Sequence, residues 1–370
     1  MPSKDAVTEA LKRAAGAGVG KSMPHHNGLL RSAPSVALVA CALIAATSRL
    51  AAQQPDHSRG RPRDPIGAIA EMLRSHRVVA IGNVEFRGDE QSQAFLRSLV
   101  RDARFPTRGT DIVVEFGNAR YQPVIDRFVR GEDVPLNELR QVWQNTTQIE
   151  WEWDLPIYEE FFRTVRAVNA PMAPSRRVRV ILADPPIDWT VVSSKAALDS
   201  VVVTREDYAA ETIRREVLSK HRRALVVFGA AHLLRSATPT TGRPNGLVER
   251  LERDGATVFT VIPEVRRDLT ALDSSASSWP IPSLVMLRGT TLGAAHWPRP
   301  DGRATPMLQD QADAILYLGP PSTMTSAKLP ATLCADTAYM TMRLSRLALL
   351  APPPGAPMKP ADMLRSSCDR

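Results

Sequence analysis

Cysteine and aromatic residues are scarce in this sequence. There are three cysteines among 370 residues, and Phe, Trp and Tyr together make up 5%. The cysteines show no paired spacing of the kind that binds zinc, so we expect no zinc-cysteine site. Few rings are present for base stacking, and the arginines are spread among acidic neighbours. We therefore expect no nucleic-acid partner, although the formal net charge is +8.

Long apolar runs are also missing, with one partial exception near the amino terminus. The run VALVACALIAA at 36–46 lies between Arg31 and Arg49, and the 17 residues that separate these arginines are fewer than the ~20 that a membrane-spanning helix needs. A basic lead, a short apolar core and an Ala-rich exit are typical of a secretory signal. We therefore expect 1–52 to be a leader that is cleaved near Ala52. The mature chain would be periplasmic or secreted and would lack a transmembrane span.

The leader allows one alternative. Leu38-Val39-Ala40-Cys41 resembles a lipobox, which would place a lipid on Cys41, whereas the apolar residues that continue past Cys41 favour ordinary cleavage. Met23 is an alternative start that would give the signal a more usual length. The polar, Pro- and Arg-rich segment that follows predicts a flexible connection over 53–64.

Removal of the leader leaves two cysteines, Cys334 and Cys368. In an oxidising compartment this pair is a candidate disulfide, which would stabilise the fold by about 3–4 kcal/mol in the chain-entropy model. Two free thiols are the alternative. The tail 351–370 begins with APPPGAPMKP, a composition that sustains neither helix nor sheet, and we expect it to be disordered.

Between these ends, helical and strand-like segments alternate over 65–350. With 44% hydrophobic residues the chain can bury a sizeable core. Apolar, β-branched runs without alternation are typical of strands buried on both faces, and they occur at 77–82, 111–116, 177–183, 223–229 and 257–262. The pattern predicts a single α/β domain with a mostly parallel central sheet flanked by helices. A helical insertion at about 120–170 follows the second strand and is expected to cover the strand ends.

Polar side chains follow four of these runs. In a parallel sheet, ligands bind beyond the carboxyl ends of the strands, so residues scattered along the sequence are expected to meet there. They are Asn83, Glu85, Glu115, Asp184 and His232. An imidazole in this position suits a general base or a metal ligand, and a carboxylate there needs a cation, a metal or hydrogen-bond donors. The sequence therefore predicts a site for a small-molecule ligand at this edge.

Each of these residues also has a purely structural interpretation. Glu115 is suited to a salt bridge with a neighbour such as Arg120 or Arg127. His232 and Asp184 are suited to capping the turns that follow their strands.

The same segments, taken in order, resemble the exported bacterial proteins of the ChaN-like and erythromycin-esterase-like superfamily, with the Tiki and TraB proteases as more remote relatives. The resemblance covers about 65–350. It rests on the strings VVAIGNVEF, DIVVEFGNARYQPVIDRFVRGEDVP, LRQVWQNTTQ, WDLPIYEEFFRTVRAVNA, RVRVILADPPIDW and LVVFGAAHLLR. It implies the fold rather than one reaction, because the family includes ester hydrolases, haem-binding lipoproteins and metal-dependent proteases.

One family motif is altered. The family usually has Gly-Glu-x-His at the end of the first strand, where 82–85 reads Gly-Asn-Val-Glu in this chain. The acid has become the amide of Asn83, and the imidazole has become the carboxylate of Glu85. Glu115 and the Gly-x-x-His motif that ends at His232 match the family. Because an amide does not exchange a proton near neutral pH, the departure predicts a changed or impaired catalytic set.

The leading functional prediction is an exported protein whose pocket hydrolyses an ester or amide of a small molecule. His232 would be the general base, and Glu115 its orienting carboxylate. Glu85 would be a second acid, and Asn83 would donate a hydrogen bond to the substrate carbonyl.

Three alternatives stay open. Carboxylates and imidazole suit Mn or Zn, so Glu85, Glu115, Asp184 and His232 are also a candidate metal site. A protein of the ChaN type would bind haem. The third possibility is a binding protein without catalysis.

The haem alternative draws on aromatic residues of the insertion. Tyr158, Tyr121 or His232 would coordinate the iron. Trp153 and Tyr158 would form an apolar wall of the pocket, or would simply pack between helices.

Overall fold

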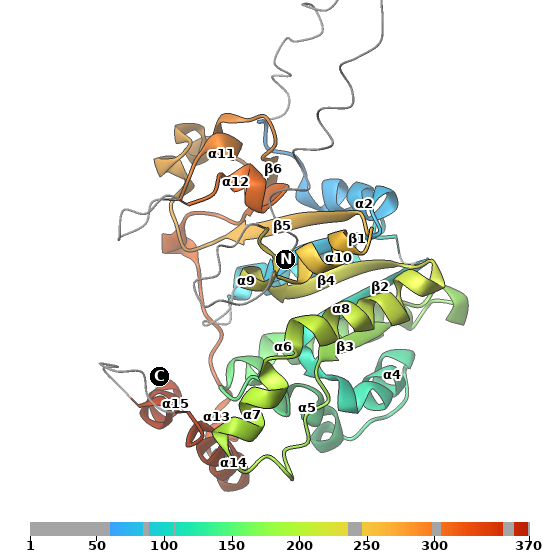
Figure 1. Ribbon diagram of the computed structural model, residues 1–370, viewed down its shortest axis with the longest axis vertical. Coiled ribbons are helices and arrows are strands. Elements are labelled where there is room, and N and C mark those ends of the chain that lie inside the picture. The colour runs from blue at the N-terminus through green and yellow to red at the C-terminus, as the bar shows by residue number, and fades with distance from the viewer. Residues whose placement is uncertain are drawn as a thin grey trace, which may run out of the picture. The chain divides into compact units, whose positions relative to one another are not determined.

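The computed structural model describes residues 60–83, 89–106, 108–235, 246–297, 305–350 and 359–368, all within the compact unit His57–Arg370. They contain a seven-stranded sheet of order β3-β2-β4-β1-β5-β7-β6 (Figure 1). The strands are β1 Val78–Asn83, β2 Thr110–Asn118, β3 Val180–Asp184, β4 Arg223–Gly229, β5 Val258–Glu264, β6 Ser283–Met286 and β7 Ala314–Tyr317. All neighbours are parallel except β6 and β7. The predicted α/β class with a mostly parallel sheet is confirmed.

The strands are apolar throughout because both faces of the sheet are buried. In β1, Val79 and Ile81 point to one apolar cluster, and Val78 and Ala80 point to the other. Helices cover both faces (Figure 1). On the first face lie α2 Pro65–Ser75, α3 Glu90–Arg101, α4 Gln122–Arg130, α5 Leu136–Gln144 and α6 Pro156–Asn169; on the second lie α8 Arg205–Glu216, α9 Ala230–Leu233 and α10 Leu247–Arg253.

The predicted insertion after the second strand consists of α4, α5 and α6. Gly131 ends α4 with φ of 105°, a left-handed conformation that glycine adopts without strain. The connection after α5 reaches the carboxyl ends of β2 and β3, where Asn118 Nδ2 donates to the carbonyls of Asn145 at 2.6 Å and Ile187 at 2.9 Å. The insertion therefore covers these strand ends, as predicted.

A smaller apolar cluster lies beside β6 and β7 and includes Leu269, Trp279, Leu292 and Leu308. The helices of this part are α11 Thr291–Ala294 and α12 Leu308–Gln311, and α7 Lys195–Val202 precedes α8. Short 3-10 helices are η1 Ala119–Tyr121, η2 Glu152–Asp154, η3 Pro174–Arg176, η4 Leu218–Lys220, η5 Leu269–Ala271, η6 Ser274–Ser278 and η7 Pro321–Thr323. No helix in the described ranges combines the length and apolarity needed to cross a bilayer.

The amino-terminal boundary predicted for the domain needs a correction. Residues 60–64 were expected to belong to a flexible connection, and 53–59 lie outside the described residues. Arg63, however, exchanges two backbone hydrogen bonds with Leu284 of β6, at 2.9 and 3.0 Å. Asp64 then caps α2 by accepting from the backbone N–H groups of Ile66 and Gly67. The ordered fold therefore begins before residue 65.

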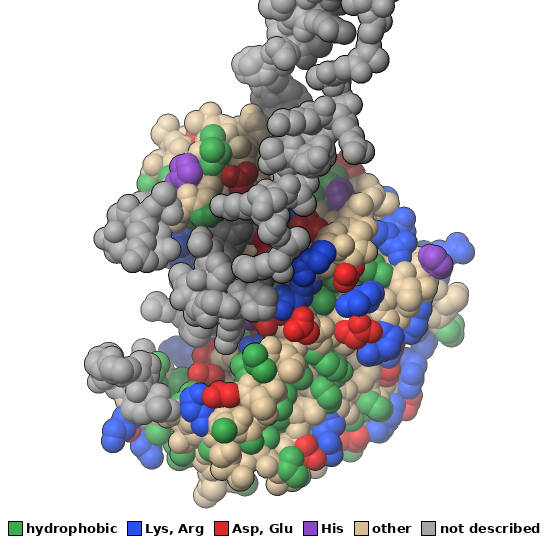
Figure 2. Space-filling view, viewed as in Figure 1, with side chains coloured by type: hydrophobic (Ala, Val, Ile, Leu, Met, Phe, Trp, Pro, Cys, Tyr) green, Lys and Arg blue, Asp and Glu red, His purple; other side chains and the backbone are tan. Residues whose placement is uncertain are grey.

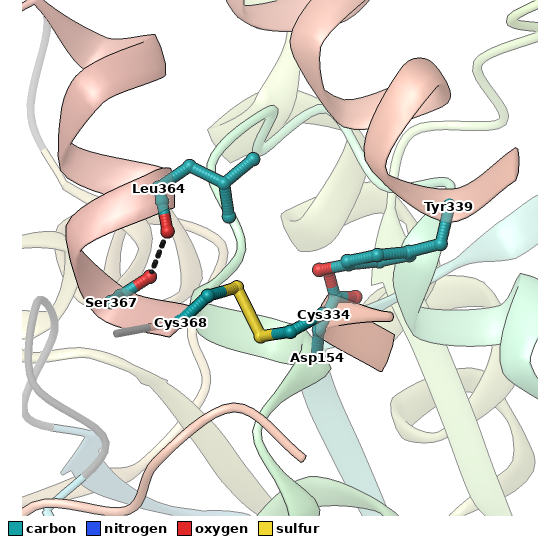
Figure 3. Close-up of a disulfide and its surroundings, with 6 residues drawn as sticks. All are labelled: Asp154, Cys334, Tyr339, Leu364, Ser367 and Cys368. Carbon is teal, nitrogen blue, oxygen red and sulfur yellow. Dashed lines mark hydrogen bonds between the residues drawn. A yellow bond between two sulfur atoms is a disulfide. The ribbon is translucent and has the colours of Figure 1, made fainter. Parts of the chain in front are cut away.

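The carboxyl-terminal prediction is wrong for part of the tail. Residues 351–370 were expected to be disordered, whereas Pro360–Cys368 forms α15, with Leu364 buried. A disulfide joins Cys368 to Cys334 at the end of α13 Ala331–Cys334 (Figure 3). The Pro-rich composition is confined to the start of the tail. The disulfide holds the remaining part of the tail, α15, against the fold.

Helix α14 Thr337–Leu347 is joined to the insertion by a buried ion pair. Arg343 donates to both carboxylate oxygens of Asp154, at 2.6 and 2.7 Å, and both side chains are 0% exposed. The hydroxyl of Tyr339 donates to Asp154 at 2.5 Å and points towards it in Figure 3. The carboxyl-terminal helices are thus fixed to the segment that covers the strand ends.

Candidate active site

Glu115 lies in the carboxyl-terminal half of β2, Asp184 ends the neighbouring strand β3, and both are 2% exposed. Glu115 Oε2 accepts the backbone N–H of Gly229, at the end of the adjacent strand β4, at 2.6 Å. Its other oxygen accepts a hydrogen bond from the guanidinium of Arg205. The three strand ends therefore meet around one carboxylate, as the position of ligand sites in parallel sheets predicts.

Arg205 was not predicted, and it lies between the two buried carboxylates. It is the first residue of α8, and its Nε is 3.5 Å from Asp184 Oδ1 while its Nη2 contacts Glu115. A buried carboxylate is destabilised unless a cation or donors compensate it. Arg205 supplies that cation for both strands, and neither Arg120 nor Arg127 does so, since these pair with Asp188 and Glu138.

Asp184 is held by the connection between α5 and η2. The backbone N–H of Thr147 donates to its Oδ2 at 2.7 Å, and the Thr147 hydroxyl lies 2.5 Å from its Oδ1. Burial raises the pKa of Asp184 to about 7, and the nearby charge of Glu115 raises it further, against the opposing effects of Arg205 and Thr147. Asp184 therefore exchanges its proton near neutral pH.

His232 lies in α9, directly after β4, with a carboxylate facing each ring nitrogen. Its Nδ1 is 2.8 Å from Glu206 Oε1, and its Nε2 is 3.4 Å from Glu115 Oε1. Burial raises the pKa of Glu206, but the hydrogen bond and charge of His232 outweigh it and lower that pKa to about 2. Glu206 is thus ionised and fixes the imidazole through Nδ1, the role that was predicted for Glu115.

This group consists of three carboxyl groups, one arginine and one histidine. Burial disfavours the ionised form of Asp184 and raises its pKa to about 7, and Arg205 is the cation that faces both Asp184 and Glu115.

Two predicted residues are only partly located. Asn83 ends β1 beside Gly229 of β4, which places its backbone at the same edge as Glu115 and His232. Its side chain, and the whole of Glu85, lie outside the described residues. Their predicted catalytic roles stay predictions.

The aromatic residues predicted to line the pocket are not at its wall. Tyr158 is 1% exposed and Trp153 is 3% exposed. Both pack on Phe116, and their own ring centroids are 4.9 Å apart. Tyr121 is half-buried, and its hydroxyl accepts from Asn145 Nδ2 at 2.9 Å. Phe116 turns to the opposite face from Glu115 because side chains alternate along a strand, so the ring cluster joins the core instead.

Among the described residues, Glu115, Asp184 and Tyr158 are not arranged as ligands of a metal ion or haem iron. Over the residues that the structure describes, no cluster of His, Cys, Asp and Glu side chains is arranged to hold a metal ion. Arg205 occupies the position between Glu115 and Asp184 that a divalent cation would take. Tyr158, proposed as an axial ligand, is enclosed by Phe116 and Trp153. A cavity of about 510 Å³ lies elsewhere, between Arg235, Glu252 and Asp310.

Comparison by sequence finds no matching family model and no matching curated protein. Comparison by structure finds a succinoglycan biosynthesis protein with a TM-score of 0.53 and 9% identity, covering 75% of this chain and 97% of that one. An erythromycin esterase mutant in its open conformation matches with a TM-score of 0.46 and 10% identity, covering 73% and 98%. ChaN of Campylobacter jejuni, solved with cofacial haem, matches with 0.35 and 13%, covering 55% and 87%. At 9% identity, the match to the succinoglycan biosynthesis protein shows the fold alone. Members of both groups that the sequence resembles, ChaN and an erythromycin esterase, are among the structural matches.

Proposed function

We propose that this protein is an exported hydrolase of small-molecule esters or amides, with His232 as its acid–base group. The observation that supports it most is the placement of the imidazole between two carboxylates at the carboxyl edge of the sheet. Glu206 accepts a hydrogen bond from the Nδ1–H group. This leaves Nε2 as the nitrogen that takes a proton from an attacking water. Glu115 then lies next to the imidazolium that forms and stabilises its charge.

The remaining residues keep this arrangement in place. Arg205 and the Gly229 N–H donate to the two oxygens of Glu115 and so fix its orientation. Asp184 contacts Arg205 from the other side and is itself held by Thr147. The chain's own residues thus supply a base, an orienting acid and a counter-charge, a set that proton transfer in ester hydrolysis requires.

The direct test is turnover of activated esters by purified protein and variants. His232→Ala is expected to lower kcat/KM by about 100-fold or more, in line with the loss of a general base. His296→Ala is the matched control, because His296 is an exposed histidine outside this site, and it should leave turnover unchanged. A folded His232→Ala protein with wild-type turnover would contradict the proposal.

The altered motif offers a second test. Asn83→Glu together with Glu85→His restores the family pattern at 82–85. If the natural protein is inactive and the double variant hydrolyses esters, the fold retains a competent pocket whose chemistry was lost. If both proteins are inactive, the result favours a binding protein without catalysis over a hydrolase.

Export is supported by the sequence of 1–52, and by its short apolar run in particular. Expression of the full chain with its leader in a bacterial host should yield a mature protein that begins near Gln53. Mass determination of the amino terminus checks this, and a mature terminus at a lipidated Cys41 would favour the lipoprotein alternative.

A further inference from the structure

The amino-terminal edge of the sheet carries a row of arginines that the candidate active site does not use. Each of the neighbouring strands β1, β4, β2 and β3 has an arginine at its start or within two residues before it. In that order they are Arg77, Arg223, Arg108 and Arg179. The backbone places them at one level. Ala224 N–H donates to the Arg77 carbonyl at 3.0 Å, Arg223 N–H to the carbonyl of Gly109 at 2.8 Å, and Ile112 N–H to the Arg179 carbonyl at 2.9 Å. With neighbouring strands about 4.8 Å apart, the row spans about 14 Å.

More basic residues flank this row. Arg176 and Arg177 precede β3, while Lys220 and Arg222 precede β4. Figure 2 shows Lys and Arg side chains gathered along the margin at which, in Figure 1, α8 connects to β4. We call the residues Arg77, Arg108, Arg176, Arg177, Arg179, Lys220, Arg222 and Arg223 the basic edge.

Carboxylates neutralise only part of this charge. Arg222 pairs with Asp111, Arg179 with Asp126 and Glu216, and Lys220 with Glu216. Among the described residues, the other members form no ion pair with a carboxylate: Arg77, Arg108, Arg176, Arg177 and Arg223. Arg108 and Arg176 are exposed. The surplus is thus a fixed positive potential at this edge.

Helix ends account for only some of the arginines that lack a carboxylate partner. Helices that return to the start of a parallel strand end at this edge, and their dipoles favour cations in the last turn, as with Arg214 and Arg215 of α8 or Arg130 of α4. Arg77 and Arg177 donate to backbone carbonyls near such ends, those of Leu218 and Arg130. Arg108 and Arg223 lie outside helices, and among the described residues their side chains form no hydrogen bond or ion pair. An anionic partner would compensate these two.

We propose that the basic edge docks the protein onto an anionic phospholipid membrane. Each basic side chain near such a surface adds electrostatic attraction to anionic lipids. The residues of these strand starts include no Phe, Trp or Tyr for base stacking, which favours a lipid surface over a nucleic acid.

This orientation keeps the candidate active site accessible. Glu115, Asp184 and His232 lie at the carboxyl edge of the same sheet, and a strand such as β4, of seven residues, separates the two edges by roughly 20 Å. A protein docked through its basic edge would present the opposite edge to the aqueous phase. The inference does not depend on whether that edge is catalytic.

Co-sedimentation of the full chain with vesicles tests the proposal. Vesicles of phosphatidylcholine containing roughly 30% phosphatidylglycerol are compared with phosphatidylcholine alone, at low salt and at about 0.5 M NaCl. We expect at least tenfold stronger binding to the anionic vesicles, lost at high salt. Because the run at 36–46 would enter both vesicles, the difference between them reports the charged surface.

Two triple variants with the same change in net charge locate the binding. Reversal of the basic edge by Arg108→Glu, Arg176→Glu and Arg223→Glu should lower anionic-vesicle binding by at least tenfold. Reversal at Arg61, Arg140 and Arg288, which form no ion pair among the described residues, should change it by less than about threefold. If the reversed edge does not fold, the three Arg→Gln substitutions replace it.

Two results would overturn the proposal. Equal losses in both triple variants would mean that net charge, and not this edge, drives binding. Binding of wild-type protein to duplex DNA of the same charge without binding to anionic vesicles would assign the edge to a nucleic acid instead.

Discussion

At the scale of single residues, the sequence identified the strand-end side chains and missed those that hold them. Glu115, Asp184 and His232 follow buried strands, so their position at one edge could be inferred from periodicity alone. Arg205 and Glu206 start a helix, where charged residues are common and carry no comparable signal. The sequence showed that two buried carboxylates would require a cation. It did not show which of the many arginines would supply it.

Arg205 gives the clearest prediction at this scale. Arg205→Met leaves Glu115 and Asp184 buried without their cation, and we expect a loss of about 3–5 kcal/mol in the free energy of unfolding. Arg120→Met is the matched control, since Arg120 forms an exposed pair with Asp188, and it should change stability little. Urea unfolding of both variants measures the contrast. Similar stability for the two would show that Arg205 does not compensate the buried charges.

At the scale of elements, the long periodic segments were predictable and the short ones were not. The strand expected at 223–229 is β4 to the residue, and the helical insertion expected at about 120–170 contains α4, α5 and α6. Strand β6 was not among the predicted strands, and α15 lies in a tail that was expected to be disordered. These elements depend on tertiary contacts, an antiparallel pairing and a disulfide, which local patterns do not encode.

The disulfide supports a prediction about α15. Cys334 and Cys368 are 34 residues apart, so replacing both by Ser should lower the free energy of unfolding by about 3–4 kcal/mol in the chain-entropy model. Protection of the α15 amides against hydrogen exchange should fall first, because Leu364 is its buried anchor. Reducing agent should affect the wild type in the same way and leave the double variant unchanged. Protection that survives in the variant would show that packing alone holds α15.

At the scale of the whole molecule, the sequence predicted the fold because its layers follow from alternation of strands and helices. The shared fold with a succinoglycan biosynthesis protein at 9% identity shows how little residue identity that architecture needs. The reaction does not follow from it, since function depends on side chains at the edge. Part of that edge, Glu85 and the Asn83 side chain, lies outside the described residues.

Three of the buried or half-buried carboxyl groups make large contributions to the pH dependence of stability. Burial and the nearby Glu150 raise the pKa of Glu152 to about 7, and burial raises that of Asp184 to about 7. Because these pKa values lie above their unfolded values, the stability these groups contribute is fully present below about pH 4 and is lost as pH rises through 7. Glu206, with its pKa lowered to about 2, acts in the opposite sense. Its contribution is present above about pH 4.5 and is lost as pH falls towards 2. The two losses and the one gain balance near pH 4, where we expect maximal stability.

Glu152→Gln isolates the contribution of Glu152 to this pH dependence, because Gln has nearly the same shape as Glu and no charge. Glu152 Oε2 is buried without a hydrogen-bond partner in the described structure, so the charge of Arg343 and the hydrogen bonds at its other atoms compensate its ionisation only in part. The variant should match the wild type near pH 4 and exceed it at pH 8 by on the order of 3 kcal/mol. Urea unfolding at both pH values measures the difference, and Glu159→Gln, at a carboxylate paired with Arg163 on the surface of α6, is the control that should show no such gain. An advantage independent of pH would mean that packing, and not ionisation of Glu152, limits the stability of the fold.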